Sequence, residues 1–580
     1  PYFVINENYG LSSSDRLVGN LGLAYKLNDH LSWQSYARMS QRSAEGDFRL
    51  ASGGLNTDEY NIWQNRRREL NYETNLTYKR TFGDLTVDGL VGGNIRKNSF
   101  NELEETTQGG LTFPNFFDIS ASVARPLIER GYAEQEVRSA YGRASLGYKS
   151  FLFLDATLRN DWSSTLPEDN NSYLYPSVGG SFVFTELMKD MSFSNVLTTG
   201  KLRGSWARVG DDLDPFQVRT VIDNLPLYGS NASAEIGNEF RTGTIKPALT
   251  TSWEIGTDLR LFNKVGLEFT YYQDDNEDKI LSLNVDPATG FSTYQINAGK
   301  IQRKGIEAAL SATPVSGAVT WDFTLNFGRN RSKIVELADG LNNYLASTQR
   351  NDTRLEHRVG EEWGMLVGRK WRRDEQGRVI VGSNGIPLYD INQERGTIQP
   401  DFTGGFFNNI TYKGISLAFS IDFQKGGLFH SLTKMYGYGS GLHKNTVGVN
   451  DKGVDWRQFP SEGGGILIPG VYENGSPNTT YIPARTYFYT SLQRDNINSN
   501  VIDGSYLKLR EVRLGYELPK AVLGSLIKSA NLGFIVSNAW LISAPGKELG
   551  IDPSELENTW YEGGQLPSTR TMGLNLRVRL

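Results

Sequence analysis

The residues that most readily perform chemistry are few in this chain and form no catalytic or metal-binding pattern. The four histidines, His30, His357, His430 and His443, show neither an HxH nor an HExxH spacing. The sequence contains no cysteine, which excludes disulfides and thiolate metal sites. It also contains no GxSxG motif. We therefore expect no catalytic residue, no metal site and no cofactor, and the sequence does not predict an enzyme.

One acidic cluster has ligand chemistry without ligand spacing. Asp274, Asp275, Glu277 and Asp278 follow a segment that alternates like a strand. Carboxylate oxygens suit calcium, but the spacing is not that of an EF-hand. The cluster is therefore interpreted either as a solvated loop tip or as a loop calcium site.

Four aromatic residues in two long polar segments are candidates for ligand contact. Trp371 lies in the segment 332–400, and Tyr436, Tyr438 and Trp456 lie in the segment 428–499. Aromatic rings stack on sugars and hold apolar peptide side chains. The same rings also build the core of a folded loop, so both roles remain open for these four residues.

A second set of candidates follows from the alternation of strands. In the last segment, Met572, Leu574 and Leu576 alternate with polar residues. This period of two gives a strand one apolar and one polar face. The polar positions, which we expect to face a barrel lumen and contact a plug, are Asn326, Asp422, Asn575, Arg577 and Arg579.

The elements that position these residues are predicted to be antiparallel strands, because alternation repeats along the whole chain. The strands are expected near 16–27, 31–44, 60–82, 85–104, 133–149, 151–163, 173–186, 199–209, 249–262, 264–276, 296–313, 318–331, 401–413, 415–427, 500–517, 530–543 and 569–580. Because the sequence has no apolar run long enough for a membrane-spanning helix, any crossing of a membrane is expected through strands.

The links between these strands alternate between short and long. Gly83-Asp84, Lys149-Ser150 and Lys413-Gly414 are tight, and 187–198 and 518–529 fall on the short side, the latter with one or two helical turns expected. The links 45–59, 105–132, 332–400 and 428–499 are long. This alternation is typical of outer-membrane barrels, with short periplasmic turns and long outer loops. The sequence therefore predicts an all-β, transmembrane antiparallel β-barrel with Leu580 on the periplasmic side, and its two longest loops are expected to be folded extracellular elements.

Several ordered motifs resemble those of one family, the SusC/RagA group of TonB-dependent outer-membrane transporters. They are Pro1-Tyr2-Phe3-Val4, Arg159-Asn160-Asp161-Trp162-Ser163-Ser164, Tyr175-Pro176-Ser177, Trp253-Glu254, Asn297-Ala298-Gly299, Lys304-Gly305-Ile306-Glu307, Pro400-Asp401-Phe402-Thr403-Gly404-Gly405, Lys425-Gly426-Gly427, Leu507-Lys508-Leu509-Arg510-Glu511 and Gly550-Ile551-Asp552-Pro553-Ser554-Glu555. Each motif is short, and their common order along the chain carries the resemblance.

The resemblance implies a plugged barrel that imports glycans or peptides across the outer membrane of a Bacteroidota-type Gram-negative bacterium. It implies a SusD-like surface lipoprotein as a lid, the TonB complex as energy source, and contact with outer-membrane lipid or lipopolysaccharide. About 17 strands lie in this sequence of the 22 expected for such a barrel. We therefore interpret residues 1–580 as the C-terminal part of one barrel domain, and expect the plug and about five strands outside this sequence.

Two other kinds of protein fit some of these features. A barrel of the same architecture could serve as an adhesin or an assembly subunit. A secreted β-rich, glycan-active enzyme would also alternate along its strands, but strict alternation of link lengths argues against it. The net charge of −5 argues against a nucleic-acid partner for any of the three.

Overall fold

The computed structural model describes residues 2–188, 195–229 and 231–580. Pro1 of the first motif and residues 189–194 of the expected link 187–198 lie outside the described residues. Two compact units divide the chain. The first comprises Pro1–Phe182, Gly204–Ser252 and Asn276–Ala298, and the second comprises Val183–Arg203, Trp253–Asp275 and Gly299–Leu580.

The main element is an antiparallel sheet of seventeen strands, which confirms the predicted fold class and all seventeen expected strands. Its strands are β1 (Tyr9–Lys26), β2 (Leu31–Leu50), β3 (Glu59–Phe82), β4 (Leu85–Leu111), β5 (Ser122–Tyr148), β6 (Leu152–Ser163), β7 (Ser172–Val183), β8 (Leu197–Asp211), β12 (Ala248–Leu261), β13 (Val265–Glu277), β16 (Lys300–Val315), β17 (Val319–Glu336), β23 (Pro400–Tyr412), β24 (Ile415–Gly426), β30 (Tyr506–Glu517), β31 (Ser529–Ser543) and β33 (Thr571–Arg579). Several are longer than predicted, so the expected link 105–132 shrinks to 112–121.

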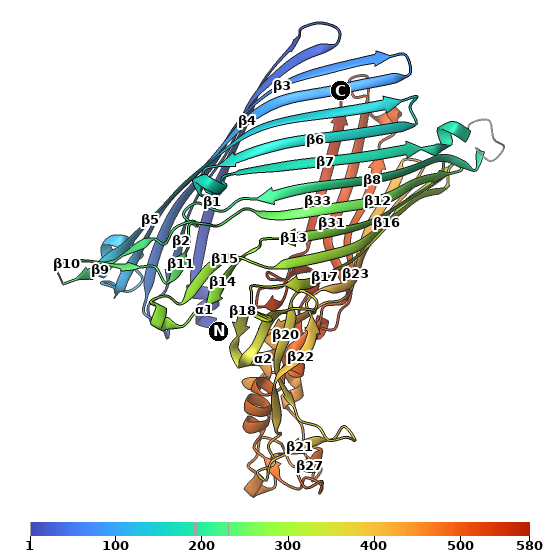
Figure 1. The fold of residues 1–580 in the computed structure, drawn as a ribbon. Helices are drawn as coiled ribbons and strands as arrows, with labels where there is room; N and C mark the ends of the chain where they lie inside the picture. Colours follow the sequence, from blue (N-terminus) through green and yellow to red (C-terminus); the bar gives the residue numbers. More distant parts are fainter. Residues whose placement is uncertain (1, 189–194, 230) are drawn as a thin grey trace. The chain divides into compact units, whose positions relative to one another are not determined.

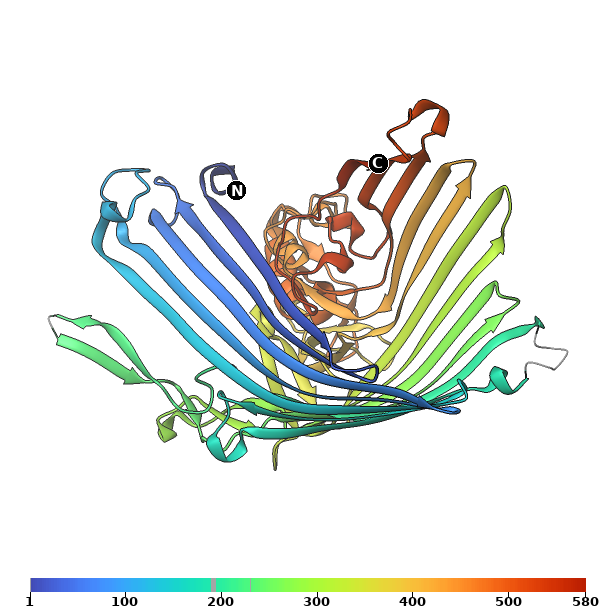
Figure 2. The same ribbon diagram turned by 90° about the horizontal axis from the view of Figure 1, so that it is seen from above.

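The first unit contains β1 to β7, each paired with the next strand in the chain. The long strands β1 to β5 lie side by side in Figure 2, coloured blue to cyan. In the second unit, β16, β17, β23, β24, β30, β31 and β33 follow one another in the same way (Figure 1). Consecutive antiparallel pairing is the topology of an up-and-down meander.

Cross-strand register separates an apolar from a polar face. One row of register partners in the first unit is largely apolar and is made by Tyr25, Trp33, Leu76, Val91, Gly142, Leu158 and Pro176. The adjacent row points to the other face and is mostly polar, with Gln34, Asn75, Gly92, Tyr141, Arg159 and Tyr175. A strand with one apolar and one polar face matches a barrel wall between lipid and a wet interior.

The apolar face of the first unit has a visible end. Along β4 it runs from Leu85 to Ile95, and the next residue on the same face is Lys97. Lys97 Nζ lies 2.7 Å from one carboxylate oxygen of Glu136, and the other oxygen lies 2.7 Å from the guanidinium of Arg138. At about 3.4 Å per residue and a tilt near 45°, the apolar stretch spans roughly 25 Å, the height of a lipid-facing band. The strands β2 to β5 continue well beyond it.

The tight links explain the pairing of the strands they join. Lys413 and Gly414 both have positive φ, at 46° and 84°. Two-residue hairpins of type I′ need positive φ at both positions, and their twist matches that of the flanking strands. The described links follow the predicted alternation in the sense that each of one set is shorter than the links before and after it. This set is 27–30, 83–84, 149–151, 262–264, 316–318, 413–414 and 518–528, and the links that flank its members include 51–58, 112–121, 212–247, 278–299, 337–399, 427–505 and 544–570.

The longer links contain elements that the sequence did not predict. They are β9 (Ile222–Tyr228), β10 (Asn231–Ile236), β11 (Glu239–Arg241), β14 (Ile280–Asn284), β15 (Thr293–Asn297), β18 (Asn343–Gln349), β19 (Thr353–Arg358), β20 (Met365–Trp371), β21 (Val379–Val381), β22 (Tyr389–Thr397), β25 (Leu428–Ser431), β26 (Ile466–Leu467), β27 (Gly470–Tyr472), β28 (Tyr481–Ile482), β29 (Val501–Asp503) and β32 (Tyr561–Glu562). The helices are α1 (Tyr2–Glu7), α2 (Leu432–Gly439), α3 (Ile497–Asn500) and a π-helix at Thr486–Arg494. The expected helical turn in 518–529 is a short 3-10 helix, Lys520–Val522.

Most of the buried apolar residues lie in the loops, although a few, such as Ile334 of β17, lie on the main sheet. Leu366, Val381, Phe429, Met435 and Ile468 are almost fully buried, and all lie in the links 337–399 and 427–505. Leucines and valines of the main sheet are instead largely exposed, as expected of a wall that meets lipid. Among the described residues, no helix has both the length and the apolarity needed to span a membrane.

Candidate ligand-binding loops and the polar face

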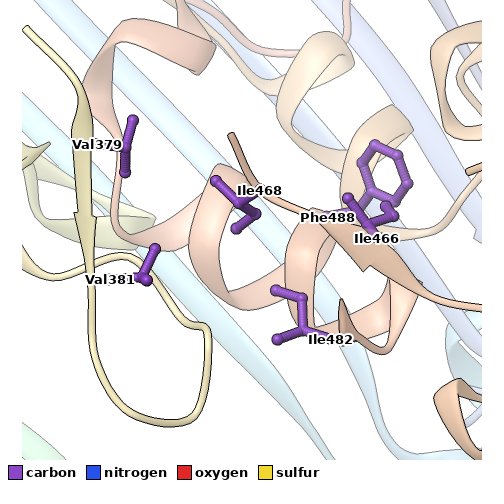
Figure 3. Packing of buried hydrophobic residues seen from close by; sticks show 6 residues of the cluster. All are labelled: Val379, Val381, Ile466, Ile468, Ile482 and Phe488. Atoms are coloured by element: carbon purple, nitrogen blue, oxygen red, sulfur yellow. The ribbon is translucent and has the colours of Figure 1, made fainter. Parts of the chain in front are cut away.

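The links 337–399 and 427–505 fold together around one core. Val379 and Val381 come from the first link, and Ile466, Ile468, Ile482 and Phe488 come from the second (Figure 3). Strand β21 of the first link pairs in parallel with β27 of the second. We call this assembly the loop subdomain. The two longest loops are therefore folded elements, and their extracellular placement stays a prediction.

Two polar contacts fasten the links to each other. The indole Nε1 of Trp371 donates a hydrogen bond to the backbone oxygen of Ser491 at 2.8 Å. The guanidinium of Arg369 lies 2.9 Å from the carboxylate of Asp495. Since burial raises the pKa of Asp495 and the Arg369 contact only partly opposes this, the carboxyl keeps a pKa above its ordinary value.

The structure places three of the four candidate aromatics against this core. Trp371, Tyr438 and Trp456 are partly buried and pack on the cluster. Tyr438 stacks on the His443 ring with centroids 4.4 Å apart, and Trp456 lies 6.1 Å from the ring of Phe488. Tyr436 belongs to the same helix, α2, but its side chain is exposed. Packing therefore already occupies part of the surface of three of the candidate rings.

A cavity of about 740 Å³ lies beside the core of the loop subdomain. Tyr438, Trp456, Tyr487 and Phe488 give it aromatic walls, and Asn445 lies at its edge. Tyr487 and Phe488 were not singled out from the sequence, because their segment shows no alternation and forms a π-helix. The volume and lining suit a small sugar or a peptide side chain.

Two other polar groups of the cavity wall are already used by the loops. Asn450 donates to the Gly463 oxygen at 2.9 Å and accepts from the backbone nitrogens of Lys452 and Val454. Asn478 donates to the Ile468 oxygen at 2.9 Å. Since these amides hold the loop backbone, the aromatic faces, the cavity shape and the Asp451 carboxylate remain to select a ligand in this cavity.

Two of the four histidines are buried inside the loops. The ring of His357 stacks on Trp363 with centroids 3.6 Å apart, and burial lowers its pKa to about 4. The ring of His430 is completely buried and lies parallel to that of Tyr561. Burial lowers the pKa of His430 to about 4 as well, although Glu562 opposes this. Both rings therefore stay neutral at neutral pH, and among the described residues no group of metal-ligating side chains surrounds them.

The five predicted polar-face residues share one face of the second unit. Asn326 is the register partner of Gly405, and Gly405 is that of Asp422. Asn575 lies on the same face through the row formed by Ser416, Gly515 and Gly533. Arg577 and Arg579 follow Asn575 at the strand period of two. Whether a plug contacts them stays a prediction.

A network of charged side chains on this face was not predicted from the sequence. Lys508 of β30 is buried, and its Nζ lies 2.7 Å from Asp552 and 2.9 Å from Glu555. Arg510 also contacts Glu555 and lies 2.5 Å from Asp422. The sequence marked both segments as family motifs, but nothing in it showed that they meet, because the link 544–570 must fold back onto β30.

This network lowers the pKa of two of its acids, Asp552 and Glu555. Burial raises the pKa of Asp552, but hydrogen bonds from Lys508 and Ser554 outweigh it and leave the pKa below its ordinary value. The pKa of Glu555 is lowered in the same way by Lys508 and Arg510, again against burial. The buried ammonium group therefore faces two carboxylates, and the network fixes the link 544–570 on the sheet.

An antiparallel sheet with alternating short and long links, one apolar face and folded long loops defines the class of outer-membrane β-barrel proteins. Within that class, a model of the family described as "TonB dependent receptor-like, beta-barrel" matches residues 2–422. The chain belongs to this family, whose members are transporters of the outer membrane and not enzymes.

Individual relatives agree with the family match. The chain is similar to the TonB-dependent receptor P3 of Formosa agariphila, with 25% identity over 634 residues that cover 100% of this chain and 59% of that protein. It is also 25% identical to receptor P26 of the same organism over 553 residues, covering 88% of this chain and 53% of that one. The chain thus spans little more than half the length of these relatives.

Among solved structures, the fold is similar to that of the RagAB peptide transporter. The TM-score is 0.77 at 17% identity, and the match covers 100% of this chain and 63% of that one. At this identity the likeness establishes the shared fold alone.

Proposed function

We propose that the protein containing this chain imports large nutrients, oligosaccharides or peptides, across the outer membrane by a TonB-dependent cycle. The observation that carries the proposal is the loop subdomain, in which the links 337–399 and 427–505 pack into one body with an aromatic cavity. A barrel that only anchors a protein in the membrane does not need such a body. The family supports transport, and the RagAB structure is that of a peptide transporter.

The proposal includes three partners. A SusD-like surface lipoprotein closes over the loop subdomain as a lid, the TonB complex supplies energy through a plug, and outer-membrane lipid or lipopolysaccharide surrounds the apolar face. Relatives in Formosa agariphila support a Bacteroidota-type Gram-negative host. An adhesin or assembly subunit is the second candidate function, and it would need neither the lipoprotein nor the plug.

The test is capture of the tagged, full-length protein from detergent-solubilised outer membranes, followed by mass spectrometry of all associated chains. We expect a SusD-like lipoprotein at near-equal amount and a plug carrying a TonB-binding segment, on this or an associated polypeptide. An unrelated tagged barrel from the same membranes is the control for carry-over. Recovery of neither component, or of the protein in the soluble fraction, would contradict the importer and favour the adhesin or a secreted protein.

A further inference from the structure

Three arginines stand next to one another across the first three strands of the first unit. Arg16 of β1 is the register partner of Arg42 of β2, and Arg42 is the register partner of Arg67 of β3. Register partners in antiparallel strands point to the same face, with their Cβ atoms about 5 Å apart. Arg16, Arg42 and Arg67 therefore form one row on a single face, which we call the arginine row.

The row lies on the polar face of the unit. Arg42 is four residues from Arg38 on the same strand, and the register of β2 is unbroken between them. Arg38 lies on the polar face, since it is paired with Glu73 and Glu73 accepts a hydrogen bond from Tyr141. The neighbours of Arg67 in the chain, Arg66 and Arg68, point to the opposite face because side chains alternate along a strand.

The row also lies beyond the apolar band. On the opposite face the band ends where Leu70 of β3 partners Lys97 of β4. Arg67 is three residues past Leu70, on the side of the long link 51–58. Long links are on the outer side of such barrels. The arginine row therefore belongs to the inner wall of the outer mouth rather than to the membrane-embedded part.

Two other arginines on this face, Arg159 and Arg38, have acidic partners, and the row has none among the described residues. Arg159 lies 2.7 Å from Asp161, and Arg38 is paired with Glu73. In the part of the chain that the structure describes, no carboxylate lies within ion-pair distance of the arginine row, and all three side chains are exposed. Within the row, the guanidinium carbon of Arg67 lies over the ring of Phe100, 4.9 Å from the ring centroid.

Like charges directly opposite one another destabilise a strand pair. The acid nearest to the row on that face of β3, Glu69, forms no ion pair with it. Among the described residues, no carboxylate therefore offsets the repulsion between the three guanidinium groups. Such an arrangement is stabilised when an anion lies across it, because guanidinium groups bind carboxylate and sulfate oxygens in pairs of hydrogen bonds.

We propose that the arginine row binds the acidic groups of an anionic oligosaccharide cargo at the outer mouth. The inference rests on the proposed import function and specifies its substrate class. Neighbouring strands are about 4.8 Å apart, closer than the roughly 6.7 Å between same-side side chains of an extended peptide. The spacing therefore favours a polyanion with a carboxylate or sulfate on each successive sugar over an acidic peptide.

The test compares two double variants of the full-length protein in detergent. Arg42→Gln with Arg67→Gln removes two charges from the row, and Arg66→Gln with Arg68→Gln removes two from the other face of the same region. The probes are oligogalacturonate, sulfated dextran oligosaccharides, neutral dextran oligosaccharides and poly-glutamate, measured by calorimetry at two salt concentrations. Heat-modifiable mobility on gels verifies that each variant is folded.

We expect the wild type to bind at least one sugar polyanion more tightly than neutral dextran and poly-glutamate. The row variant should lose about ten-fold or more of that affinity, as removal of charge-assisted hydrogen bonds predicts, and the other-face variant should stay within about two-fold. Equal loss in both variants, tighter binding of poly-glutamate, or no binding of any sugar polyanion would overturn the inference.

The import function is tested separately. The lipoprotein and plug are recovered by capture without any cargo, so failure of the polyanion experiment leaves the importer standing with a neutral or peptide cargo. Failure of the capture experiment with intact polyanion binding would instead indicate an anion-binding barrel with another role.

Discussion

A buried lysine holds the link between the last two strands of the sheet. Lys508 is buried against Asp552 and Glu555, and these acids come from a segment far along the chain. Removing one member of a buried ion pair leaves charge uncompensated, which costs about 3–5 kcal/mol. We therefore expect Lys508→Met to destabilise the link 544–570 by about 3 kcal/mol or more, seen as faster proteolysis and hydrogen exchange in that link.

An exposed lysine gives the matched control. Lys528 lies near the start of β31, and the structure describes it as exposed. Lys528→Met should change the free energy of unfolding by less than about 0.5 kcal/mol, as is usual for surface substitutions. Equal exchange rates in the 544–570 link for the wild type and Lys508→Met would show that the network does not hold it.

The buried histidines predict an acid-sensitive loop subdomain. The pKa of His357 falls from 6.5 to about 4 on folding, because burial disfavours the charged ring. Between pH 6.5 and pH 4, the unfolded link therefore binds a proton at His357 more readily than the folded link does. The contribution of neutral His357 to folding stability is complete above pH 6.5 and is lost as the pH falls towards 4. The loss is on the order of 3 kcal/mol at most.

The measurement is hydrogen exchange of residues 353–371 between pH 7 and pH 4.5, corrected for intrinsic rates. His357→Phe keeps a ring on Trp363 without a titrating group, and it should reduce the acid sensitivity. A variant as sensitive as the wild type would show that His357 is not responsible and would point to His430, which has the same pKa direction.

At the scale of single residues, the sequence predicted the strand face on which a side chain lies better than it predicted which other side chain it contacts. Alternation correctly put Asn326, Asp422 and Asn575 on one face, because that property is local. It did not connect Lys508 with Asp552, since this contact depends on how a long link folds back. For the same reason it left open whether Trp371 and Trp456 bind ligand or pack, and both pack on the loop core.

At the scale of elements, the loop subdomain depends on one aromatic side chain. Phe488 is 6% exposed and touches the rings of Tyr438, Trp456 and Tyr487. Truncating a buried phenylalanine to alanine costs about 3–5 kcal/mol. We expect Phe488→Ala to separate the links 337–399 and 427–505, detected as increased exchange in both β21 and β27, while the main sheet keeps its protection.

Tyr436 gives the contrasting variant on a neighbouring helix. Its side chain is 44% exposed and lies outside the core cluster. Tyr436→Ala should leave exchange in β21 and β27 unchanged. If it lowers affinity for cargo without changing that exchange, Tyr436 has the ligand role predicted for it, and unchanged affinity would remove it from the site.

The seventeen strands of the main sheet were predictable, and the smaller strands were not. A strand between lipid and water must alternate at nearly every position, and the tight links between such strands use short turn sequences such as Lys413-Gly414. Strands such as β21 and β27 span three residues each and pair in parallel between two links. Their pairing is set by the shared core, which a local pattern does not reveal.

At the scale of the whole molecule, the two edge strands differ from the rest of the sheet. Every residue of β1 and of β33 is exposed. Unpaired backbone groups in lipid cost several kcal/mol each. Because β1 pairs only with β2 and β33 only with β31 in the described residues, we expect their free edges to be paired in the working protein by further strands of a larger barrel. This chain spans 53–59% of its relatives.

The orientation of the molecule in the membrane follows from the apolar face and is open to a direct test. Val91 lies in the middle of the apolar band of β4 and is 59% exposed, and Ser99 lies on the same face beyond Lys97. Arginine at the bilayer midplane of a barrel costs about 2–4 kcal/mol and near the interface about 0–1 kcal/mol. Val91→Arg in the full-length protein should therefore lower the free energy of unfolding in lipid vesicles by about 2–4 kcal/mol, and Ser99→Arg should lower it by less than about 1 kcal/mol.

The two variants add the same charge to the same strand and face, so the difference between their free energies of unfolding measures the depth of each position in the membrane. Equal costs would mean that this face does not meet lipid, and the polar face with its arginine row would then lose its place on the interior wall.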